Sequence, residues 1–186
     1  NLVPLFAGAS LSFGLKKTFD IGSEVEYSIK FMEMLGQTTK DTSAGIRDAL
    51  RQIDQETLFS LTELSSAMLR LGQSGLSVGE SMQTLKPAAA LATAGMVDLK
   101  TATDLIIQAH ALFGRTSADA SRTASQLFTI TKSGVLNVED LAGSLRYASE
   151  SNTRFGKTLE ESLVLLGSLA SAGLKGASGG TALINF

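Results

Sequence analysis

The sequence predicts an all-α protein, a multi-helix bundle of αα-hairpins with a long N-terminal helix. Apolar residues recur at intervals of three and four along most of the chain, as they do on one face of a helix. Capping residues precede several of these stretches and glycines follow them. The only β-branched clusters, at 127–131 and 135–138, are too short or misplaced for strands.

The amino-acid composition alone argues against several classes of protein and of site. The 186 residues are enough for one or two domains, and a hydrophobic fraction of 44% argues against disorder. A net charge of −2 without a basic run gives no support for nucleic-acid binding through phosphate neutralisation. The chain has no cysteine, which excludes disulfides, thiolate zinc sites and cysteine nucleophiles.

Residues 1–14 form an apolar lead-in segment. Pro4, Gly8 and Gly14 interrupt it, and it is shorter than the roughly 20 residues of a transmembrane helix. It also lacks the basic start and the small-residue cleavage site of a signal peptide. We expect it to pack against a partner or the next helix, and membrane contact is the alternative.

The next region, residues 15–57, is expected to hold the long N-terminal helix and a connector. The helix spans about residues 15–35, where apolar side chains recur at helical spacing. The residues expected to face inward are Phe19, Val25, Ile29 and Met32.

The third region, residues 58–186, carries repeated helix-start signals and is expected to form one helical module. In a capping box a hydroxyl accepts from a free backbone N–H, and an acid three residues later bonds back. Four pairs fit or nearly fit this pattern: Ser60 with Glu63, Ser77 with Glu80, Thr116 with Asp119, and Thr158 with Glu161. Two further residues, Asp98 and Asn137, are plausible N-caps. Helix stops are expected at Gly36, Gly72 or Gly75, Gly95, Gly114, Gly134, Gly156 and Gly173.

Two helices of this module have special features. Pro87 is expected to begin a second short helix after residues 77–86, because proline disrupts a helix interior. The helix at about 159–170 adds Val164, Leu165 and Leu169 to its inward stripe, so it is apolar nearly all round. Such a pattern predicts a central helix.

A glycine-rich stretch follows this helix and is expected to be a structural turn. The helix stops at Gly173, and a new apolar start is expected at Thr181. The turn residues, where a tight bend and close helix approach leave no room for side chains, are Gly173, Gly176, Gly179, Gly180 and Thr181. A phosphate-binding loop is not favoured, because no Gly-Lys-Ser/Thr has the required spacing and no strand precedes the stretch.

The sequence offers no catalytic, cofactor-binding or metal-binding residues. His110 is the only histidine and is expected to be a packing or surface residue, since no further ligands accompany it. The acidic pairs Glu139–Asp140 and Glu160–Glu161 stand in predicted first helical turns, where they complement the helix dipole. This placement accounts for them without acid–base catalysis.

Several short motifs, in order over about 160 residues, resemble the core region of phage tail tape measure proteins. The family ends this region with Ala-Gly-Ile-Lys-Gly, two variable residues, Ala-Gly-Thr and Ala-Leu, and this chain has the similar segments 172–176 and 179–183. Segments 138–148, 65–77 and 112–120 resemble further family motifs. The chain departs from the family at Gly179, Ser125 and Ile184, where the family favours other residues.

The resemblance implies a non-enzymatic virion protein in the lumen of the phage tail, present in the host cytoplasm during assembly. Such proteins set tail length while the tube polymerises and leave with or ahead of the DNA at infection. The implied partners are the tail tube protein, the tail-tip or hub proteins and tail assembly chaperones. The resemblance also implies self-association as a parallel oligomer, expected to be a trimer, and host envelope contact during infection. It implies no sequence-specific nucleic-acid partner and no cofactor.

The many caps and glycines add an expectation about the form of this segment. A molecular ruler works by length, whereas a chain with so many helix ends folds back on itself. We therefore expect a folded helical module near the tail tip, as a fragment of a longer chain. Two alternatives remain: a cell-wall hydrolase module carried on a tail protein, and a generic helical scaffold from a cellular protein.

Overall fold

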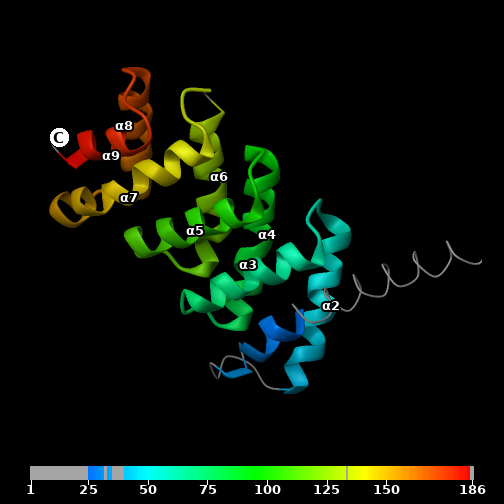
Figure 1. Cartoon of the computed structure of the whole chain (residues 1–186). Coiled ribbons are helices and arrows are strands. Elements are labelled where there is room, and N and C mark those ends of the chain that lie inside the picture. The colour runs from blue at the N-terminus through cyan, green and yellow to red at the C-terminus, as the bar shows by residue number, and fades with distance from the viewer. Residues whose placement is uncertain (1–24, 32, 35–39, 133, 185–186) are drawn as a thin grey trace, which may run out of the picture. The chain divides into compact units, whose positions relative to one another are not determined.

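The computed structural model describes residues 25–31, 33–34, 40–132 and 134–184. The described residues are almost entirely helical and contain no strand, which confirms the all-α prediction (Figure 1). The chain divides into two compact units, residues 1–69 and 70–186. The division falls inside helix α3 (Leu61–Gln73). The three regions proposed from the sequence, 1–14, 15–57 and 58–186, stay a prediction.

In the first unit, the described residues 25–31 and 33–34 are helical and α2 spans Lys40–Glu56. Val25 and Ile29 are buried, as predicted for the long N-terminal helix. The lead-in segment 1–14 and the inward residues Phe19 and Met32 lie outside the described residues.

Polar contacts join the helices of this unit. The guanidinium of Arg47 on α2 forms an ion pair with Glu26, and the Ser28 hydroxyl donates to the Ser65 carbonyl at 3.2 Å. The side chains buried beside them on α2 and α3 are Ile46, Leu50, Ile53, Leu64 and Met68. The unit therefore has a small apolar core, and polar contacts link its helices at the edge of that core.

The second unit contains the remaining helices. In chain order they are α4 (Val78–Gly95), α5 (Leu99–Phe113), the 3₁₀ helix η1 (Ser117–Asp119), α6 (Ala120–Thr131), α7 (Val138–Phe155), α8 (Leu159–Ser171) and α9 (Gly176–Ile184). Consecutive helices α4–α5 and α8–α9 pack as hairpins. The two most extensive contacts, however, join helices two places apart, α7 with α9 and α4 with α6, and α5 also packs on α7 (Figure 1).

The local signals for helix starts are confirmed. Ser77 and Thr158 form complete capping boxes with Glu80 and Glu161. The side chain of Asp98 accepts from the Thr101 N–H at 2.6 Å, as expected of an N-cap. Ser60 and Asn137 also cap the helices that follow them, through contacts with Glu63 and Asp140.

The expectation for Pro87 is wrong. Helix α4 continues through Pro87 from Val78 to Gly95 without a break. Proline lacks the N–H that would bond to the preceding turn, which makes an interior position unfavourable. Residues on both sides of Pro87 are buried, among them Leu85, Ala88, Leu91 and Ala92. Burial of this continuous face offsets the missing hydrogen bond.

The end of α4 also differs from the prediction. Gly95 was expected to take the left-handed position after the helix, but it is the last helical residue. Met96 takes that position, with φ 54° and ψ 40°. Gly95 instead serves close packing, since a Cβ there would stand 2.6 Å from Val138 Cγ2.

Helix α8 is not the central helix that its sequence predicts. Its inward stripe of Leu159, Leu163, Leu166 and Ala170 is buried. Val164 on another face is 65% exposed, and Leu165 and Leu169 are only partly covered. Among the described elements, α8 packs extensively only on α6 and α9. An apolar composition on every face therefore does not place this helix at the centre.

Candidate functional site

The glycine-rich stretch divides into a turn and a helix. Gly173, with φ 88°, ends α8, and its N–H donates to the Ala170 carbonyl at 2.9 Å. The Leu174 N–H donates to the Leu169 carbonyl at 2.9 Å, which completes a Schellman-type helix end. Helix α9 then begins at Gly176.

The predicted helix start at Thr181 is therefore wrong. Gly176, Gly179, Gly180 and Thr181 all belong to α9, so the turn covers a shorter stretch than expected. Glycines are poor helix formers in isolation, which is why the sequence pattern indicated a turn. Packing against α7 stabilises the helix instead.

Close approach of α9 to α7 explains why glycines occupy this helix. A Cβ on Gly180 would stand 2.4 Å from the Ser144 carbonyl oxygen and 2.7 Å from Tyr147 Cβ. The Ser144 hydroxyl donates to the Gly176 carbonyl at 2.8 Å, which adds a direct hydrogen bond between α7 and α9. A Cβ on Gly143, on the same helix as Ser144, would stand 3.4 Å from Gly176 Cα. The crossing is structural and offers no group for chemistry.

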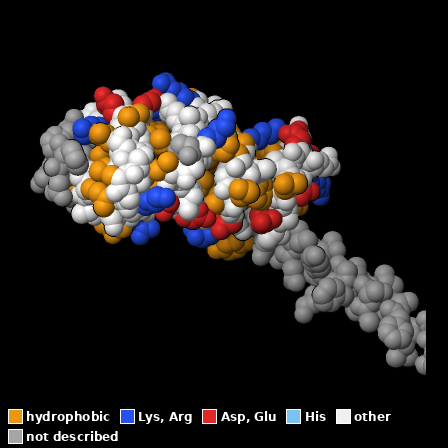
Figure 2. Space-filling model, turned by 90° about the horizontal axis from the view of Figure 1, so that it is seen from above, with side chains coloured by type: hydrophobic (Ala, Val, Ile, Leu, Met, Phe, Trp, Pro, Cys, Tyr) orange, Lys and Arg blue, Asp and Glu red, His pale blue; other side chains and the backbone are white. Residues whose placement is uncertain are grey.

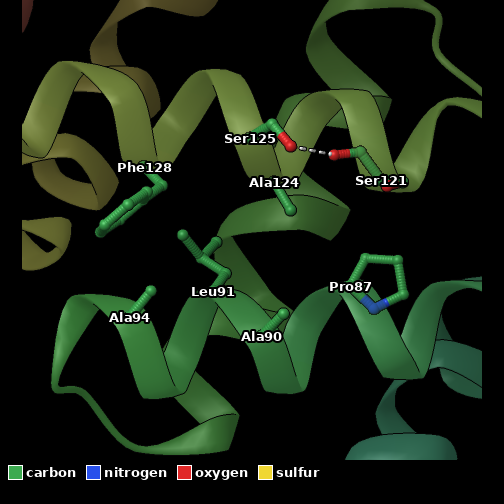
Figure 3. Close-up of a pocket in the computed structure, with 8 residues that line it drawn as sticks. All are labelled: Pro87, Ala90, Leu91, Ala94, Ser121, Ala124, Ser125 and Phe128. Atoms are coloured by element: carbon green, nitrogen blue, oxygen red, sulfur yellow. Dashed lines mark hydrogen bonds between the residues drawn. The ribbon is translucent and has the colours of Figure 1, made fainter.

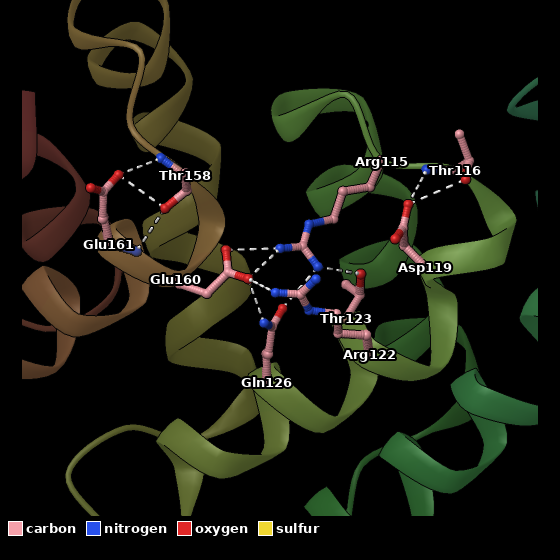
Figure 4. Close-up of polar contacts among 9 residues, drawn as sticks. All are labelled: Arg115, Thr116, Asp119, Arg122, Thr123, Gln126, Thr158, Glu160 and Glu161. Atoms are coloured by element: carbon pink, nitrogen blue, oxygen red, sulfur yellow. Dashed lines mark hydrogen bonds and ion pairs between the residues drawn. The ribbon is translucent and has the colours of Figure 1, made fainter.

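A polar cluster around Glu160 is the most connected group of charged side chains in the described residues (Figure 4). Arg115, in the loop after α5, donates to both carboxylate oxygens of Glu160, at 2.9 and 2.8 Å. Arg122 and Gln126 on α6 donate to Glu160 Oε1 at 2.9 and 2.6 Å. The cluster thus ties the first turn of α8 to α6 and to the loop before it.

These donors set the charge of Glu160. The pKa of its carboxyl is lowered from 4.5 to about 2, because its own backbone N–H, Gln126 and Arg115 donate hydrogen bonds to it. Partial burial raises the pKa but is outweighed. Glu160 is therefore ionised at neutral pH, whereas a general acid needs a pKa near the working pH. The predicted first-turn location is confirmed, but no local pattern indicates its partners, which lie 34–45 residues away along the chain.

The second acid of each pair serves in a helix cap. Glu161 accepts from the Thr158 N–H at 2.8 Å, and this bond lowers its pKa. Asp140 accepts from the Asn137 N–H at 3.4 Å. Glu139 is exposed in the first turn of α7. The carboxylates of both pairs thus lie at helix starts, as the sequence predicts.

His110 lies on α5 and is only 8% exposed, in agreement with a packing role. Its Nε2 is buried and has no hydrogen-bond partner among the described residues. Burial lowers the pKa of the imidazole, and Arg115 lowers it further, while Asp119 acts in the opposite direction. The side chain is thereby favoured in its neutral form.

The remaining observations concern metals, membranes and charge. Across the described residues, no group of three or more His, Asp and Glu side chains is placed to hold a metal ion. No described helix is long and apolar enough to cross a membrane. On the face drawn in Figure 2, basic and acidic side chains are interspersed with apolar patches. This face offers apolar contact surface, with no concentrated charge of one sign.

Comparison with known proteins places these features in a family. The chain is 22% identical over 178 residues to a "Tape measure protein" of Pneumococcus phage Dp-1. The match covers 96% of this chain but only 15% of that relative's length. No solved structure matches the chain. The family model for phage-related minor tail proteins matches residues 47–186, so the chain belongs to the phage-related minor tail protein family.

Proposed function

We propose that this chain is a segment of a tail tape measure protein, which lies in the lumen of the phage tail. The parent protein sets tail length during assembly and leaves with or ahead of the DNA at infection. The observation that carries the proposal is the match of residues 47–186 to a phage tail family, together with a tape measure relative matched over nearly the whole chain. Because the chain spans 15% of that relative, the activity of the parent protein is inferred.

Within the parent protein, this segment is a folded module near the tail tip and not part of the length-encoding rod. The longest described helices, α4 and α7, have 18 residues each and so reach only about 27 Å. Helices α4 to α9 pack against one another. The second unit is therefore much shorter than one continuous helix with the same number of residues would be. The parent protein still needs a long continuous helix to measure the tail. We assign that helix to other parts of the parent chain.

The same proposal specifies partners and location. The module contacts tail-tip or hub proteins and the tail tube protein, and it self-associates as a parallel oligomer, with a trimer expected. Before incorporation, in the host cytoplasm, assembly chaperones hold the parent chain. During infection the module contacts the host envelope. Each of these contacts requires exposed surface beyond the helix-to-helix packing described above.

Electron cryo-microscopy of intact virions tests the location. We expect compact density near the tail tip, with short helices that match α4 to α9 and the close crossing of α7 and α9. Density that traces this segment as one continuous rod along the tube would contradict the proposal. A map that shows the module elsewhere in the lumen would keep the tail function and reject the tip location.

A cell-wall hydrolase module is the alternative function. The carboxyl group of Glu160, which has the most polar partners in the described cluster, does not favour it. The low pKa of Glu160 leaves no proton to donate at neutral pH. Release of soluble fragments from purified peptidoglycan by the isolated chain measures this activity directly. We expect no release above a buffer control, and sustained release would support the alternative.

A further inference from the structure

Two adjoining hollows run between α4 and α6, and Ala94 and Phe128 line both. The first, about 160 Å³, is shown in Figure 3. Leu91 and Ala124 are buried at its floor. Its walls are small or apolar: Pro87, Ala90 and Ala94 from α4, and Ser121, Ser125 and Phe128 from α6. The second, about 350 Å³, continues past the end of α4. We refer to the two together as the α4–α6 groove.

Met96 lies at the edge of this groove in an unfavourable state. It lines the second hollow, is 92% exposed, and has a φ of 54°. A left-handed backbone costs a non-glycine residue free energy, and exposure leaves the apolar side chain in water. Glycine at this position would remove both costs. Stability therefore does not account for Met96, whereas a flexible apolar contact with a partner does.

The second hollow also carries an unbalanced charge. Lys132 and Lys175 line it, are exposed, and form no ion pair among the described residues. Asp140 lines the same hollow, but its carboxylate accepts from the Asn137 N–H. Two lysines therefore stand beside one carboxylate, which leaves a net positive charge at this end of the groove. The groove is apolar along α4 and α6 and basic at this end.

We propose that the α4–α6 groove binds an amphipathic helix of a partner protein, with acidic residues at one end of that helix. The apolar face of the partner helix lies on Ala90, Phe128 and Met96, and its carboxylates meet Lys132 and Lys175. Small residues along the walls allow a helix to approach closely. The described residues that line the groove belong to helices and to the loops that join them, and none is in a strand, so an extended peptide has no strand edge to pair with.

Two fluorescein-labelled helical peptides of 18 residues test the proposal against the full chain. Both carry leucines at i, i+3, i+7 and i+10, and they differ in three glutamates or three lysines at one end. Fluorescence anisotropy measures the dissociation constants at low and high salt. We expect the acidic peptide to bind roughly tenfold more tightly at low salt, because two ion pairs favour it, and the difference to shrink at high salt.

Reversing the charge of the two lysines in the groove gives the most decisive test. Lys132→Glu with Lys175→Glu should reverse the preference, so that the lysine peptide binds more tightly. The control is Lys100→Glu with Lys157→Glu, which makes the same change in net charge outside the groove and should keep the original preference. This control also breaks the 3.4 Å ion pair of Lys100 with Asp104, so its fold is checked by thermal unfolding before binding is compared. Equal binding of both peptides, no binding, or reversal by the control pair would overturn the proposal.

Met96→Gly separates binding from stability. We expect roughly tenfold weaker binding of the acidic peptide, from loss of one apolar side chain, with an equal or higher thermal midpoint of unfolding. The control Val164→Ala removes exposed apolar surface on α8 and should leave the dissociation constant unchanged. Unchanged binding in Met96→Gly would count against the groove.

A second copy of this chain is the competing occupant. Sedimentation velocity over a range of concentrations detects it. Self-association that Met96→Gly abolishes would assign the groove to a second copy and overturn the partner-helix assignment. None of these measurements depends on where the module lies in the tail, so their failure and that of the proposed function are distinguishable.

Discussion

Arg115 donates hydrogen bonds of 2.9 and 2.8 Å to the two carboxylate oxygens of Glu160, 45 residues further along the chain. The Arg115 side chain is 13% exposed, whereas that of Glu160 is 38% exposed. Both bonds come from one guanidinium nitrogen, Nη2, while Nη1 donates to Gln126 at 2.8 Å, so the arginine holds two side chains at once. It links the loop after α5 directly to the first turn of α8.

The first prediction concerns this contact. Arg115→Ala should lower the free energy of unfolding by about 1–2 kcal/mol, because Glu160 and Gln126 lose charged partners in a partly shielded site. Chemical denaturation at neutral pH measures the change. Arg122→Ala is the control, since Arg122 contacts the same carboxylate but is 68% exposed, and it should cost less than about 0.5 kcal/mol. Equal losses in the two variants would contradict the assigned role.

Acidification provides the second prediction. The folded-state pKa of Glu160, about 2, lies below its usual 4.5, so its stabilising contribution is present above pH 4.5 and is lost as pH falls toward 2. Wild type should exceed Glu160→Gln in stability at neutral pH, and the difference should shrink over this window. Denaturation series on both proteins from pH 7 to pH 2 measure it. A difference that stays constant with pH would show that the charge of Glu160 contributes nothing.

His110 gives a third prediction in a separate pH range. Its folded-state pKa is lowered below 6.5, so stability is complete above pH 6.5 and falls as pH drops toward the folded-state pKa. The slope reaches at most about 1.4 kcal/mol per pH unit for one proton. Asp119 and Arg115 are the charged groups that act on it. His110→Gln should flatten the stability profile measured by chemical denaturation below pH 6.5, and an unchanged slope there would assign it to other groups.

The α7–α9 crossing leads to the fourth prediction. Gly180→Ala should destabilise the second unit by about 1–3 kcal/mol, because the new Cβ overlaps the backbone of Ser144 and the helices must move apart. Gly79→Ala on α4 is the control, since no atom lies within 4 Å of its Cβ position. The control should keep or slightly raise stability. Thermal unfolding compares the two, and a Gly180→Ala variant as stable as the control would refute the close approach.

Sequence reasoning identified the helix starts because capping is local. Ser77 with Glu80 and Thr158 with Glu161 act within four residues, so their roles are visible in the sequence alone. The buried stripes of α5 and α8 follow from helical spacing for the same reason.

The errors share a different cause, which is contact with distant residues. Pro87 and Gly180 have poor helix propensity, yet both lie within helices that tertiary packing stabilises. Gly95 is a glycine because Val138 leaves no room for a side chain, and the left-handed position falls on Met96. The partners of Glu160 are also remote in sequence, and no local pattern announces them.

Extensive contacts in the second unit join only elements that are adjacent or two places apart along the chain. Such an arrangement behaves almost as a one-dimensional stack, in which each helix is held by its near neighbours. A pulling force applied at one end therefore unfolds the helices one after another. Helix α9 separates from α7 while α4 and α5 keep their contacts. A force measurement on this unit should show several small steps rather than one large rupture, with the Arg115–Glu160 contact marking the step at which α8 releases.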